Sequence, residues 1–332
     1  MLDESQPVYL YYIEPHFRYD RPQKGRYRQF HQIGAEIIGE QDPVLDAKMM
    51  HIGCRMLDSI GLKGEYTLKI NSLGNEKERE KYLLDLRDFF ENKKHVLDEI
   101  DLARLEINPL RLLDSKNPEV RGLLEYAPKM ESYLKGESKE FYAKVKMYLE
   151  ILGVPYVEDH TLVRGLDYYS RTVFEVIKVD VDENGKEREI TITGGGRYDY
   201  LAKMMGSKKD VPSVGTGLGI ERIMMFPECK TLAPRIMKPP KVYFIQLGFE
   251  AKLKSLCIME TLRKSRIPVH QTLSKDSLSA QLAMAEKMEI PYCIIFGQKE
   301  AMDNTVIVRN MSTHSQDTVK IDALSDYIKH LK

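Results

Sequence analysis

The sequence predicts a mixed α/β (α+β) protein of two domains, and three observations lead to this prediction. The chain has 332 residues, which is more than a single hydrophobic core usually organises. Strand-like segments lie on both sides of a highly charged stretch with helical periodicity at about 75–152. Prolines between 234 and 240 then interrupt regular structure. We therefore expect one domain at 1–236, with a helical insertion at about 75–152, and a second domain at 240–332.

The first forty residues predict a β-hairpin. Val8 to Glu14 is rich in tyrosine and β-branched residues, and Phe30 to Ile38 alternates back after a basic loop from Arg21 to Arg28. Asp42 and Pro43 then predict the start of a helix, with the aspartate as N-cap and the proline at the first helical position. An apolar stripe at three- and four-residue spacing supports this helix: Leu45, Met49, Ile52, Met56 and Ile60.

Four further strands of the first domain are predicted from alternation or β-branched residues, at Tyr66 to Ile70, Thr161 to Val163, Thr172 to Val181 and Glu189 to Thr193. Asn71 to Gly74 should end the first of them, and Asp182 to Gly185 should form the turn of a long hairpin. We expect the helical insertion to lie between strands of one larger sheet.

Beyond the prolines, short apolar runs alternate with helical stretches. The expected order is strand, helix, strand, helix, strand, at Val242 to Leu247, Glu250 to Ser265, Val269 to His270, Ser277 to Met288 and Tyr292 to Phe296. This order indicates a small α/β domain with a mostly parallel sheet.

Bulk composition narrows the class of protein. Fifty basic and fifty acidic residues cancel, so any nucleic-acid contact must come from local patches. No apolar run could span a bilayer, and the N-terminus lacks a signal-peptide pattern. The cysteines are far apart in the sequence and are expected to be buried, reduced thiols: Cys54, Cys229, Cys257 and Cys293. The expectation is a cytoplasmic protein without a membrane partner and without a protein-held metal.

The basic segment at 18–28 holds five cationic side chains and one acid between two predicted strands. It suits a solvated hairpin loop. It also suits a polyphosphate site, because arginine pairs bidentately with phosphate oxygens and keeps its charge. Gly25 would let the loop fold over a ligand, and Tyr27 and Phe30 offer rings for stacking on a base. The residues alone leave both interpretations open.

Three later segments each allow a structural and a functional interpretation. The run LVRGLDYY at 162–169 is either a turn with core tyrosines or a site where an arginine meets developing negative charge. The run GGGRYD at 194–199 is either a tight bend or a close approach of backbone to a ligand. The run GTGLGIER at 215–222 suggests a helix packed closely on a sheet, where Arg222 would more often be a surface residue than a phosphate ligand.

Together these segments resemble the bacterial-type histidyl-tRNA synthetases, which are class II aminoacyl-tRNA synthetases. The similarity extends from Val8 to the C-terminus. FRYDRPQKGRYRQFHQ at 17–32 resembles motif 2, and GLGIER at 217–222 resembles motif 3. LVRGLDYY at 162–169 and GGRYD at 195–199 resemble the two histidine-specific signatures of the family. NPLRLLD at 108–114 matches the family's usual sequence before its insertion.

The resemblance implies a class II antiparallel sheet with a helical insertion, followed by an α/β anticodon-binding domain. It implies ligation of L-histidine to tRNA(His), with ATP and Mg²⁺, through histidyl-adenylate. Mg²⁺ would be held mainly by the phosphates and by one carboxylate. A homodimer is implied for the full-length form.

The resemblance also implies roles for the residues of the ATP site. Arg18 would hold the α-phosphate, and Arg26 and Arg222 would bind the outer phosphates. Phe30 would stack on adenine. Arg164 would stabilise negative charge at the α-phosphate while the histidine carboxylate attacks.

For the amino acid, the resemblance implies a second set of residues. Gln32 would contact the amino group, while Glu36 and Tyr169 would hydrogen-bond the imidazole, and Tyr168 and Tyr198 would line the pocket. An imidazole offers a donor and an acceptor, so a carboxylate and a hydroxyl can read both nitrogens. Polar partners left unpaired by a wrong amino acid would reject it.

Two departures from the family pattern stand beside this likeness. Asp20 occupies a position where the family usually has glutamate. Nothing in the chain resembles motif 1 or the Thr-x-Glu-type loop, so we expect a catalytic domain that lacks its N-terminal part and has an exposed sheet edge. A synthetase-like protein that binds tRNA or histidine, or regulates another enzyme, without aminoacylation therefore remains an alternative, as does an inactive fragment. A class II enzyme for another amino acid is disfavoured by the run at 162–169.

Overall fold

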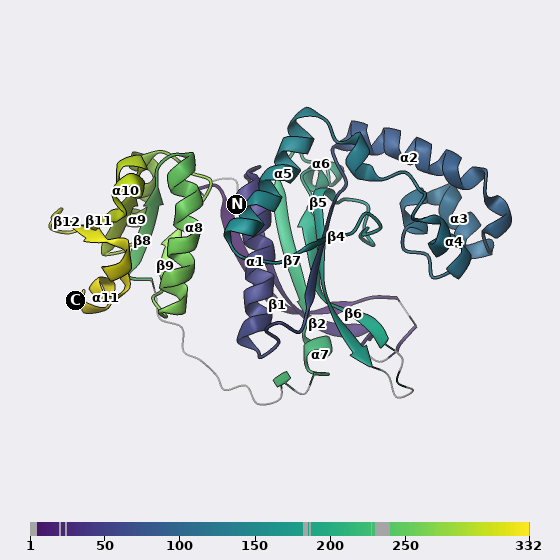
Figure 1. The fold of residues 1–332 in the computed structure, drawn as a ribbon, viewed down its shortest axis with the longest axis horizontal. Helices are drawn as coiled ribbons and strands as arrows, with labels where there is room; N and C mark the ends of the chain where they lie inside the picture. The colour runs from purple at the N-terminus through teal and green to yellow at the C-terminus, as the bar shows by residue number, and fades with distance from the viewer. Residues whose placement is uncertain are drawn as a thin grey trace. The chain divides into compact units, whose positions relative to one another are not determined.

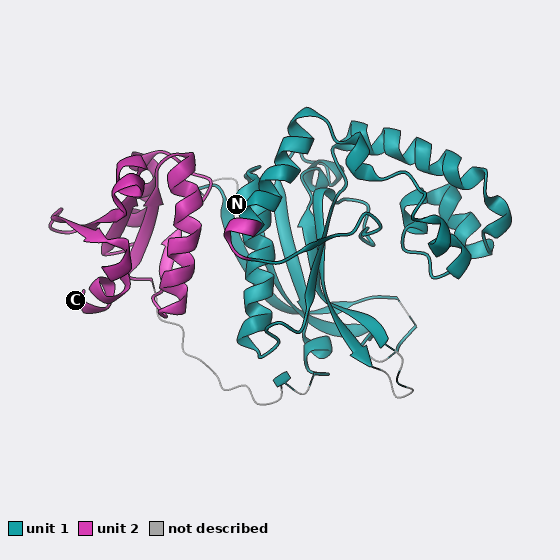
Figure 2. Cartoon of the chain, viewed as in Figure 1, with its two compact units in different colours: residues 1–149, 154–232 teal, residues 150–153, 233–332 magenta. Residues whose placement is uncertain are grey.

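The computed structural model describes residues 5–19, 21–23, 25–181, 185, 187–226, 228–229 and 240–331. The chain divides into two compact units (Figure 2), the first made of Met1–Leu149 and Val154–Leu232 and the second of Glu150–Gly153 and Ala233–Lys332. Each unit has its own sheet (Figure 1).

A seven-stranded sheet forms the centre of the first unit, in the order β1-β2-β7-β6-β5-β3-β4. All neighbouring strands are antiparallel except β3 and β4. The antiparallel sheet implied by the resemblance is therefore confirmed. The strands are β1 (Val8–Phe17), β2 (Gln29–Ile38), β3 (Thr67–Ser72), β4 (Val157–Glu158), β5 (Ser170–Val181), β6 (Glu187–Arg197) and β7 (Ser213–Gly219).

One long helix covers one face of this sheet. Helix α1 (Pro43–Ser59) begins as predicted, because the Asp42 side chain accepts a hydrogen bond of 2.9 Å from the Val44 N–H and Pro43 needs no such partner. It lies against β2, β5, β6 and β7. Its apolar stripe is fully buried at Leu45 and Met49, which leaves the opposite face of the sheet available for a site.

The charged stretch in the middle of the first unit is helical, as predicted. Figure 1 shows α2, α3 and α4 grouped beside the sheet. A capping box at Asn75 and Glu78 starts the first of these helices. The helices here are α2 (Glu76–Glu91), α3 (Glu99–Ile107), α4 (Pro118–Leu123) and α5 (Gly136–Ile151), with 3-10 turns at 94–96, 109–112 and 130–133. Two short helices, α6 (Leu201–Met204) and α7 (Ile220–Ile223), follow later.

The second unit is a five-stranded sheet in the order β12-β11-β10-β8-β9, with apolar core on both faces. Only the pairings among β9, β8 and β10 are parallel, so the predicted mostly parallel sheet is half antiparallel. Its elements are β8 (Val242–Gln246), α8 (Phe249–Lys264), β9 (Val269–Gln271), α9 (Leu278–Lys287), β10 (Tyr292–Phe296), α10 (Gln298–Asp303), β11 (Thr305–Asn310), β12 (Gln316–Lys320) and α11 (Leu324–His330), with a 3-10 turn at 321–323.

Two strand predictions are wrong. Residues 161–163 form no strand, because the Asp159 carboxylate accepts hydrogen bonds from the Thr161 N–H and hydroxyl and holds this stretch as a turn. The short strand β4 lies just before it. Strand β3 continues through Asn71 and Ser72 instead of ending before them, because the Asn71 amide is satisfied by the Leu162 carbonyl. The predicted turn at 182–184, and Pro234 and Pro239, lie outside the described residues.

The cysteines are free thiols. Cys54 and Cys293 are buried, and burial raises their thiol pKa to about 11 and about 12. Cys257 is exposed on α8, so the prediction of buried thiols is wrong for this residue. Across the described part of the chain, no helix combines the length and apolar character needed to cross a membrane.

Candidate functional site

The sheet face of the first unit that points away from α1 has glycines on three adjacent strands. Gly34 of β2 lies directly opposite Gly217 of β7, which in turn lies opposite Gly194 of β6. Gly215 is two residues from Gly217 and shares its face. We call Gly34, Gly194, Gly215 and Gly217 the glycine floor. Here the sheet surface is bare backbone, so large side chains can lie flat on it.

Two side chains lie on the floor at β2 and β7. A Cβ atom on Gly215 would overlap the Glu36 carboxylate, and one on Gly34 would overlap the Tyr12 ring. The space that a methyl group would fill is therefore occupied by side chains from the neighbouring strands. Burial raises the pKa of the Tyr12 hydroxyl, and the nearby Glu36 carboxylate raises it further.

Two more side chains lie over the other floor positions. A Cβ atom on Gly194 would come within 2.5 Å of the Arg164 guanidinium, and one on Gly217 within 3.2 Å of the Gln32 amide nitrogen. An arginine, a carboxylate, an amide and a phenol thus converge on one patch of backbone. This patch presents both charges and both hydrogen-bonding roles to a small polar ligand.

Three tyrosines form an aromatic cluster beside the floor. The Tyr198 hydroxyl donates a hydrogen bond of 2.5 Å to Glu36 Oε2. Tyr168 packs against Tyr169 with ring centroids 4.6 Å apart and against Tyr198 at 5.8 Å. Burial raises the pKa of both Glu36 and Tyr198. Aromatic side chains arranged in this way can pack against a flat ring.

A carboxylate holds Arg164 in position. Arg164 forms an ion pair with Glu175 of β5, and the Thr191 hydroxyl of β6 donates a 3.0 Å hydrogen bond to the other oxygen of that carboxylate. Arg222 of α7 donates from its Nε to the Gly25 carbonyl at 3.0 Å and also to the Thr191 carbonyl. Arg164, through Glu175, and Arg222 therefore both lie near Thr191 in the middle of β6.

Further arginines make this end of the site electropositive. Burial lowers the pKa of Arg222, and the positive charges of Arg18 and Arg26 lower it further. The Arg18 guanidinium lies 4.2 Å from the centre of the Phe30 ring, and its Nε donates to the Tyr27 carbonyl at 2.8 Å. A ligand with several negative charges would relieve this repulsion.

The structure brings the sequence-predicted residues into one region. Gln32, Glu36 and Arg164 lie on the glycine floor, and the tyrosines 168, 169 and 198 form the aromatic cluster beside it. Arg18 and Phe30 stack at the hairpin end, while Arg26 is exposed in the loop. Arg222 is not a free surface side chain but is partly buried against that loop.

Three residues of this region were not anticipated from the sequence. They are Tyr12, Glu175 and Thr191, all on strands and all facing the floor or the arginines on it. The alternation of β1 and β5 was visible in the sequence, but no local signal gives the cross-strand register. Only that register shows which neighbours each side chain meets.

Arg197, the arginine of the 194–199 run, has a structural role and does not belong to the site itself. Arg197 is fully buried and donates to Asp46 of α1 at 2.9 Å and to Asp199 at 3.0 Å. Its guanidinium also lies 5.3 Å from the centre of the Phe141 ring of α5. This buried ion cluster connects α1, β6 and α5 immediately before Tyr198, so it fixes the backbone from which that tyrosine projects.

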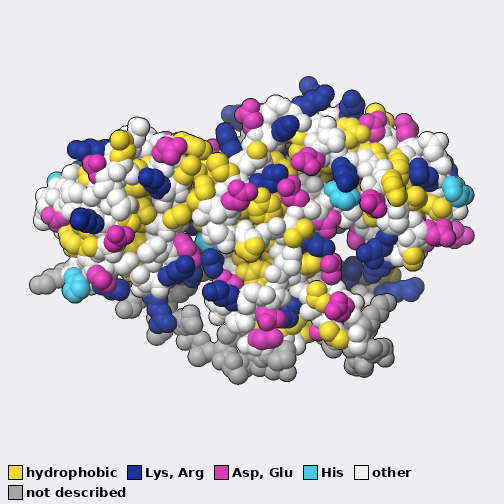
Figure 3. All heavy atoms as spheres, viewed as in Figure 1, with side chains coloured by type: hydrophobic (Ala, Val, Ile, Leu, Met, Phe, Trp, Pro, Cys, Tyr) yellow, Lys and Arg dark blue, Asp and Glu magenta, His cyan; other side chains and the backbone are white. Residues whose placement is uncertain are grey.

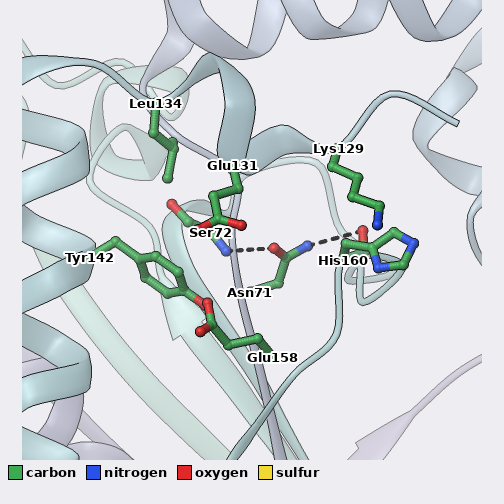
Figure 4. A pocket seen from close by; sticks show the side chains of 8 residues that line it. All are labelled: Asn71, Ser72, Lys129, Glu131, Leu134, Tyr142, Glu158 and His160. Atoms are coloured by element: carbon green, nitrogen blue, oxygen red, sulfur yellow. Dashed lines mark hydrogen bonds between the residues drawn. The ribbon is translucent and has the colours of Figure 1, made fainter. Parts of the chain in front are cut away.

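A separate cavity of about 140 Å³ lies between β3, β4 and the helical stretch (Figure 4). The Asn71 amide there accepts a 2.8 Å hydrogen bond from the Ser72 N–H and donates to the His160 carbonyl at 3.4 Å. Glu158 accepts from Lys146 at 3.0 Å. These groups are engaged within the protein, and none of the sequence-predicted site residues lines the cavity. We therefore place the site on the glycine floor.

Figure 3 shows basic and acidic side chains interspersed over the face that it draws. Within the described residues, no group of three or more His, Cys, Asp or Glu side chains is arranged to hold a metal ion.

Comparisons with known proteins identify the relatives of this chain. A family model described as histidyl-tRNA synthetase matches residues 1–223, and one described as anticodon binding domain matches residues 241–331. The chain is 39% identical over 311 residues to the chloroplastic histidine–tRNA ligase of Gracilaria tenuistipitata var. liui, covering 94% of this chain and 72% of that protein. It is 39% identical over 317 residues to the histidine–tRNA ligase of Aquifex aeolicus, covering 96% and 75%. Among solved structures, the apo histidyl-tRNA synthetase of S. aureus is similar with a TM-score of 0.54 and 32% identity, covering 98% of this chain and 78% of that one.

Proposed function

This chain belongs to the histidyl-tRNA synthetase family, and we propose from this premise that histidine and ATP bind side by side on the glycine floor. The activity that follows from membership is histidine–tRNA ligation. The observation that carries the proposed site is the Tyr198–Glu36 hydrogen bond of 2.5 Å beside the arginines. A ring-binding pocket and an anion-binding cluster share one patch of backbone there.

In the first step the histidine carboxylate attacks the α-phosphorus of ATP. A bond forms between a carboxylate oxygen and phosphorus, the bond to the bridging oxygen breaks, and pyrophosphate leaves with the electron pair. Arg164 and Arg18 would stabilise the negative charge that builds up on the α-phosphate oxygens. Arg164 can do so reproducibly because Glu175 and Thr191 hold its guanidinium over Gly194.

The remaining residues would bind and orient the two substrates. Arg26 and Arg222 would bind the outer phosphates, and Phe30 would stack on adenine. Such a displacement depends mainly on alignment and charge stabilisation, which fixed arginines supply. Mg²⁺ would enter with ATP, with the phosphates as its main ligands, and would neutralise phosphate charge. Glu175 is the carboxylate among the arginines that fits a contact to such an ion.

The protein would recognise the amino acid by its imidazole ring. Glu36 and Tyr169 would hydrogen-bond the imidazole nitrogens, with Tyr168 and Tyr198 packed around the ring, while Gln32 would contact the amino group. An apolar amino acid would offer no hydrogen bond to the half-buried Glu36 carboxylate and would be rejected for that reason.

In the second step a ribose hydroxyl at the tRNA terminus attacks the carbonyl carbon of histidyl-adenylate, and AMP leaves. We propose that residues 1–236 are the catalytic domain with its insertion at about 75–152, and that residues 240–332 bind the anticodon of tRNA(His). The match of the anticodon-binding family model to 241–331 and the separate sheet of the second unit support this division.

We also propose a homodimer and a cytoplasmic location. Strand β1 is an edge strand whose outer side exposes Tyr11, Ile13 and Phe17, with 81%, 59% and 74% of their surface accessible. Apolar side chains gathered in this way are typical of a protein interface. Four free cysteines suit a reducing compartment.

The proposal is tested by amino-acid-dependent exchange of pyrophosphate into ATP, followed by charging of tRNA(His). Exchange with histidine and with no other amino acid is expected. Exchange with a different amino acid would contradict the assignment of the pocket. Binding of histidine without exchange or charging would instead support the alternative of a binding protein without ligase activity.

A further inference from the structure

The segment 163–168 carries Arg164 and Tyr168 into the site, and its own backbone holds it only weakly. Strand β5 begins at Ser170, and Gly165 to Asp167 are exposed. Across the part of the chain that the structure describes, no backbone–backbone hydrogen bond joins residues 163–168 to a helix or strand. Such a segment opens at little cost unless side chains from other elements hold it.

Two residues of the run NPLRLLD, which lies in the helical stretch, bind this segment. Arg111 Nη2 donates to the Gly165 carbonyl at 2.5 Å, and Asn108 Nδ2 donates to Asp167 Oδ1 at 2.7 Å. Asn108 caps a 3-10 turn, and Arg111 lies within that turn. Side chains three residues apart in a 3-10 turn point the same way, so both donors reach the same segment.

A third side chain binds the end of the segment from α2. Arg79 Nη1 donates to the Tyr169 carbonyl at 2.7 Å and to the Asp167 carbonyl at 3.4 Å. We call Arg79, Asn108 and Arg111 the clamp. Its two arginines direct charged donors at backbone carbonyls, and hydrogen bonds from charged donors are stronger than those between neutral groups.

The clamp is itself anchored in the helical stretch. Pro109 and Leu112 of the 3-10 turn are buried. Asn108 Oδ1 accepts a hydrogen bond of 3.1 Å from the Leu110 N–H, while its Nδ2 donates to Asp167. Because both ends of the amide are engaged, the side chain is fixed in one orientation. The segment is therefore tied to a packed part of the protein.

The clamp bears on two groups of the proposed site. The Arg164 guanidinium pairs with Glu175, and its backbone adjoins Gly165, whose carbonyl accepts from the clamp. The Tyr169 carbonyl accepts from the clamp as well. Arg222, proposed to bind the outer phosphates, lies instead on α7. The clamp should therefore influence the amino acid and the α-phosphate more than the outer phosphates.

We propose that the clamp residues are positioning residues, which hold Arg164 and Tyr169 in place from outside the site. The inference rests on the function proposed above, because it takes these two residues to act on ATP and histidine. A misplacement of about 1 Å can cost about 100-fold in rate. The helical stretch thereby contributes to the geometry of adenylate formation.

Asn108→Asp separates the two roles of this side chain. The new carboxylate can still accept from the Leu110 N–H, so the protein should unfold near the wild-type temperature. The donor to Asp167 is lost, and two negative charges face each other. In histidine-dependent pyrophosphate exchange, kcat should fall about tenfold and the KM for histidine should rise. The KM for ATP should stay near the wild-type value.

Exchanging the two groups tests whether this contact is responsible. In the double variant Asn108→Asp/Asp167→Asn, an amide at position 167 can donate to a carboxylate at position 108, which restores the hydrogen bond in the opposite direction. We expect the double variant to recover most of the lost kcat. A double-mutant cycle should therefore give a favourable coupling between the two positions.

Arg111→Ala removes the hydrogen bond to Gly165, and Arg121→Ala is its matched control. Arg121 is exposed on α4, so its loss changes the net charge equally. Trypsin cleavage after Arg164 measures how freely the segment opens, without any substrate. Cleavage should be several-fold faster in Arg111→Ala and Asn108→Asp than in wild type or Arg121→Ala.

Wild-type kcat and wild-type cleavage in Asn108→Asp and Arg111→Ala would overturn the inference and leave the proposed function intact. A kcat that the double variant did not recover would also overturn it, because the contact with Asp167 would then not position the segment. If wild type showed no exchange, the proposed function would fail and the catalytic part of the inference with it. Trypsin cleavage would still decide whether the clamp holds the segment.

Discussion

Gly215 lies directly across from Glu36, and the space beside its α-carbon is filled by the Glu36 carboxylate. We expect Gly215→Ala to push this carboxylate out of the pocket. Because the obstructing atoms are the end of a flexible side chain, the fold should lose at most about 1–3 kcal/mol. Histidine affinity should fall at least about tenfold, measured by titration, through loss of a partly buried charged hydrogen bond.

Gly122→Ala is the control for this substitution. A Cβ atom on Gly122 of α4 would meet nothing within 4 Å, so the change should preserve binding and raise stability by at most about 1 kcal/mol. Wild-type histidine affinity in Gly215→Ala would show that the close approach to Glu36 does not matter.

Glu36 should carry a stability cost that depends on pH. Burial raises the pKa of its carboxyl in the folded protein, so the folded state holds the proton more tightly than the unfolded state. The ionised carboxylate therefore destabilises the fold above the raised pKa, and this cost disappears as pH falls below the unfolded value of about 4.3. Glu36→Gln should thus be more stable than wild type at pH 7, by on the order of 1 kcal/mol.

Denaturant unfolding of both proteins between about pH 7 and pH 4 checks this expectation. The advantage of Glu36→Gln should shrink on acidification, while histidine affinity should be lower at every pH. An advantage that grew toward low pH would have the wrong sign and would contradict a raised pKa.

The site was only partly predictable from its residues. The arginines and tyrosines of the runs at 18–28 and 162–169 stood out because their chemistry is unusual for a loop or turn. The glycines of the 194–199 and 215–222 runs allowed a bend or a close approach, and the sequence could not choose between them. That choice depends on the cross-strand register, which places Gly217 between Gly34 and Gly194.

At the scale of elements, the buried cluster of Arg197, Asp46 and Asp199 joins β6 to α1. Asp46→Asn removes one charge of a pair whose side chains are fully buried. We expect it to destabilise the first unit by about 3–5 kcal/mol, because the remaining charges are left poorly compensated. Thermal and denaturant unfolding would measure this loss.

Asp88→Asn in α2 removes an exposed acid and should change stability by no more than about 0.5 kcal/mol. If the free energy of unfolding of Asp46→Asn were no lower than that of Asp88→Asn, the buried cluster would not stabilise the packing of α1 on β6.

Long elements with strong patterns were predicted well, and short ones were not. The β1–β2 hairpin and α1 were readable because alternation, an N-cap and a proline agree locally. The stretch 161–163 was misread because three β-branched and aliphatic residues look like a strand, whereas Asp159 turns the chain. The alternation of strands and helices before β11 does not indicate that β11 and β12 extend the second sheet as antiparallel strands.

At the scale of the whole molecule, equal numbers of acidic and basic residues leave no net field to attract substrates. ATP binding should therefore depend on the local arginine cluster. Raising salt from about 50 mM to about 500 mM shortens the screening length from well above to below 10 Å. We expect the KM for ATP to rise several-fold over this range while that for histidine changes little, as measured by pyrophosphate exchange.

An Arg222→Gln variant, with one charge fewer in the cluster, should show a smaller change of the ATP KM with salt. Equal salt dependence for histidine and ATP would argue against a localised cluster and for a general effect of salt on the fold.

The glycine floor also limits how this enzyme could be retuned. Saturation libraries that aim to make it charge a different amino acid usually vary every residue near the ligand. At Gly34, Gly194 and Gly215 any new side chain would displace a neighbouring functional group before it met the substrate, and at Gly217 it would press on the Gln32 amide. Substitutions that change the amino-acid specificity should therefore be found at Tyr12 and at the tyrosines 168, 169 and 198. Substitutions of the four glycines should be inactive.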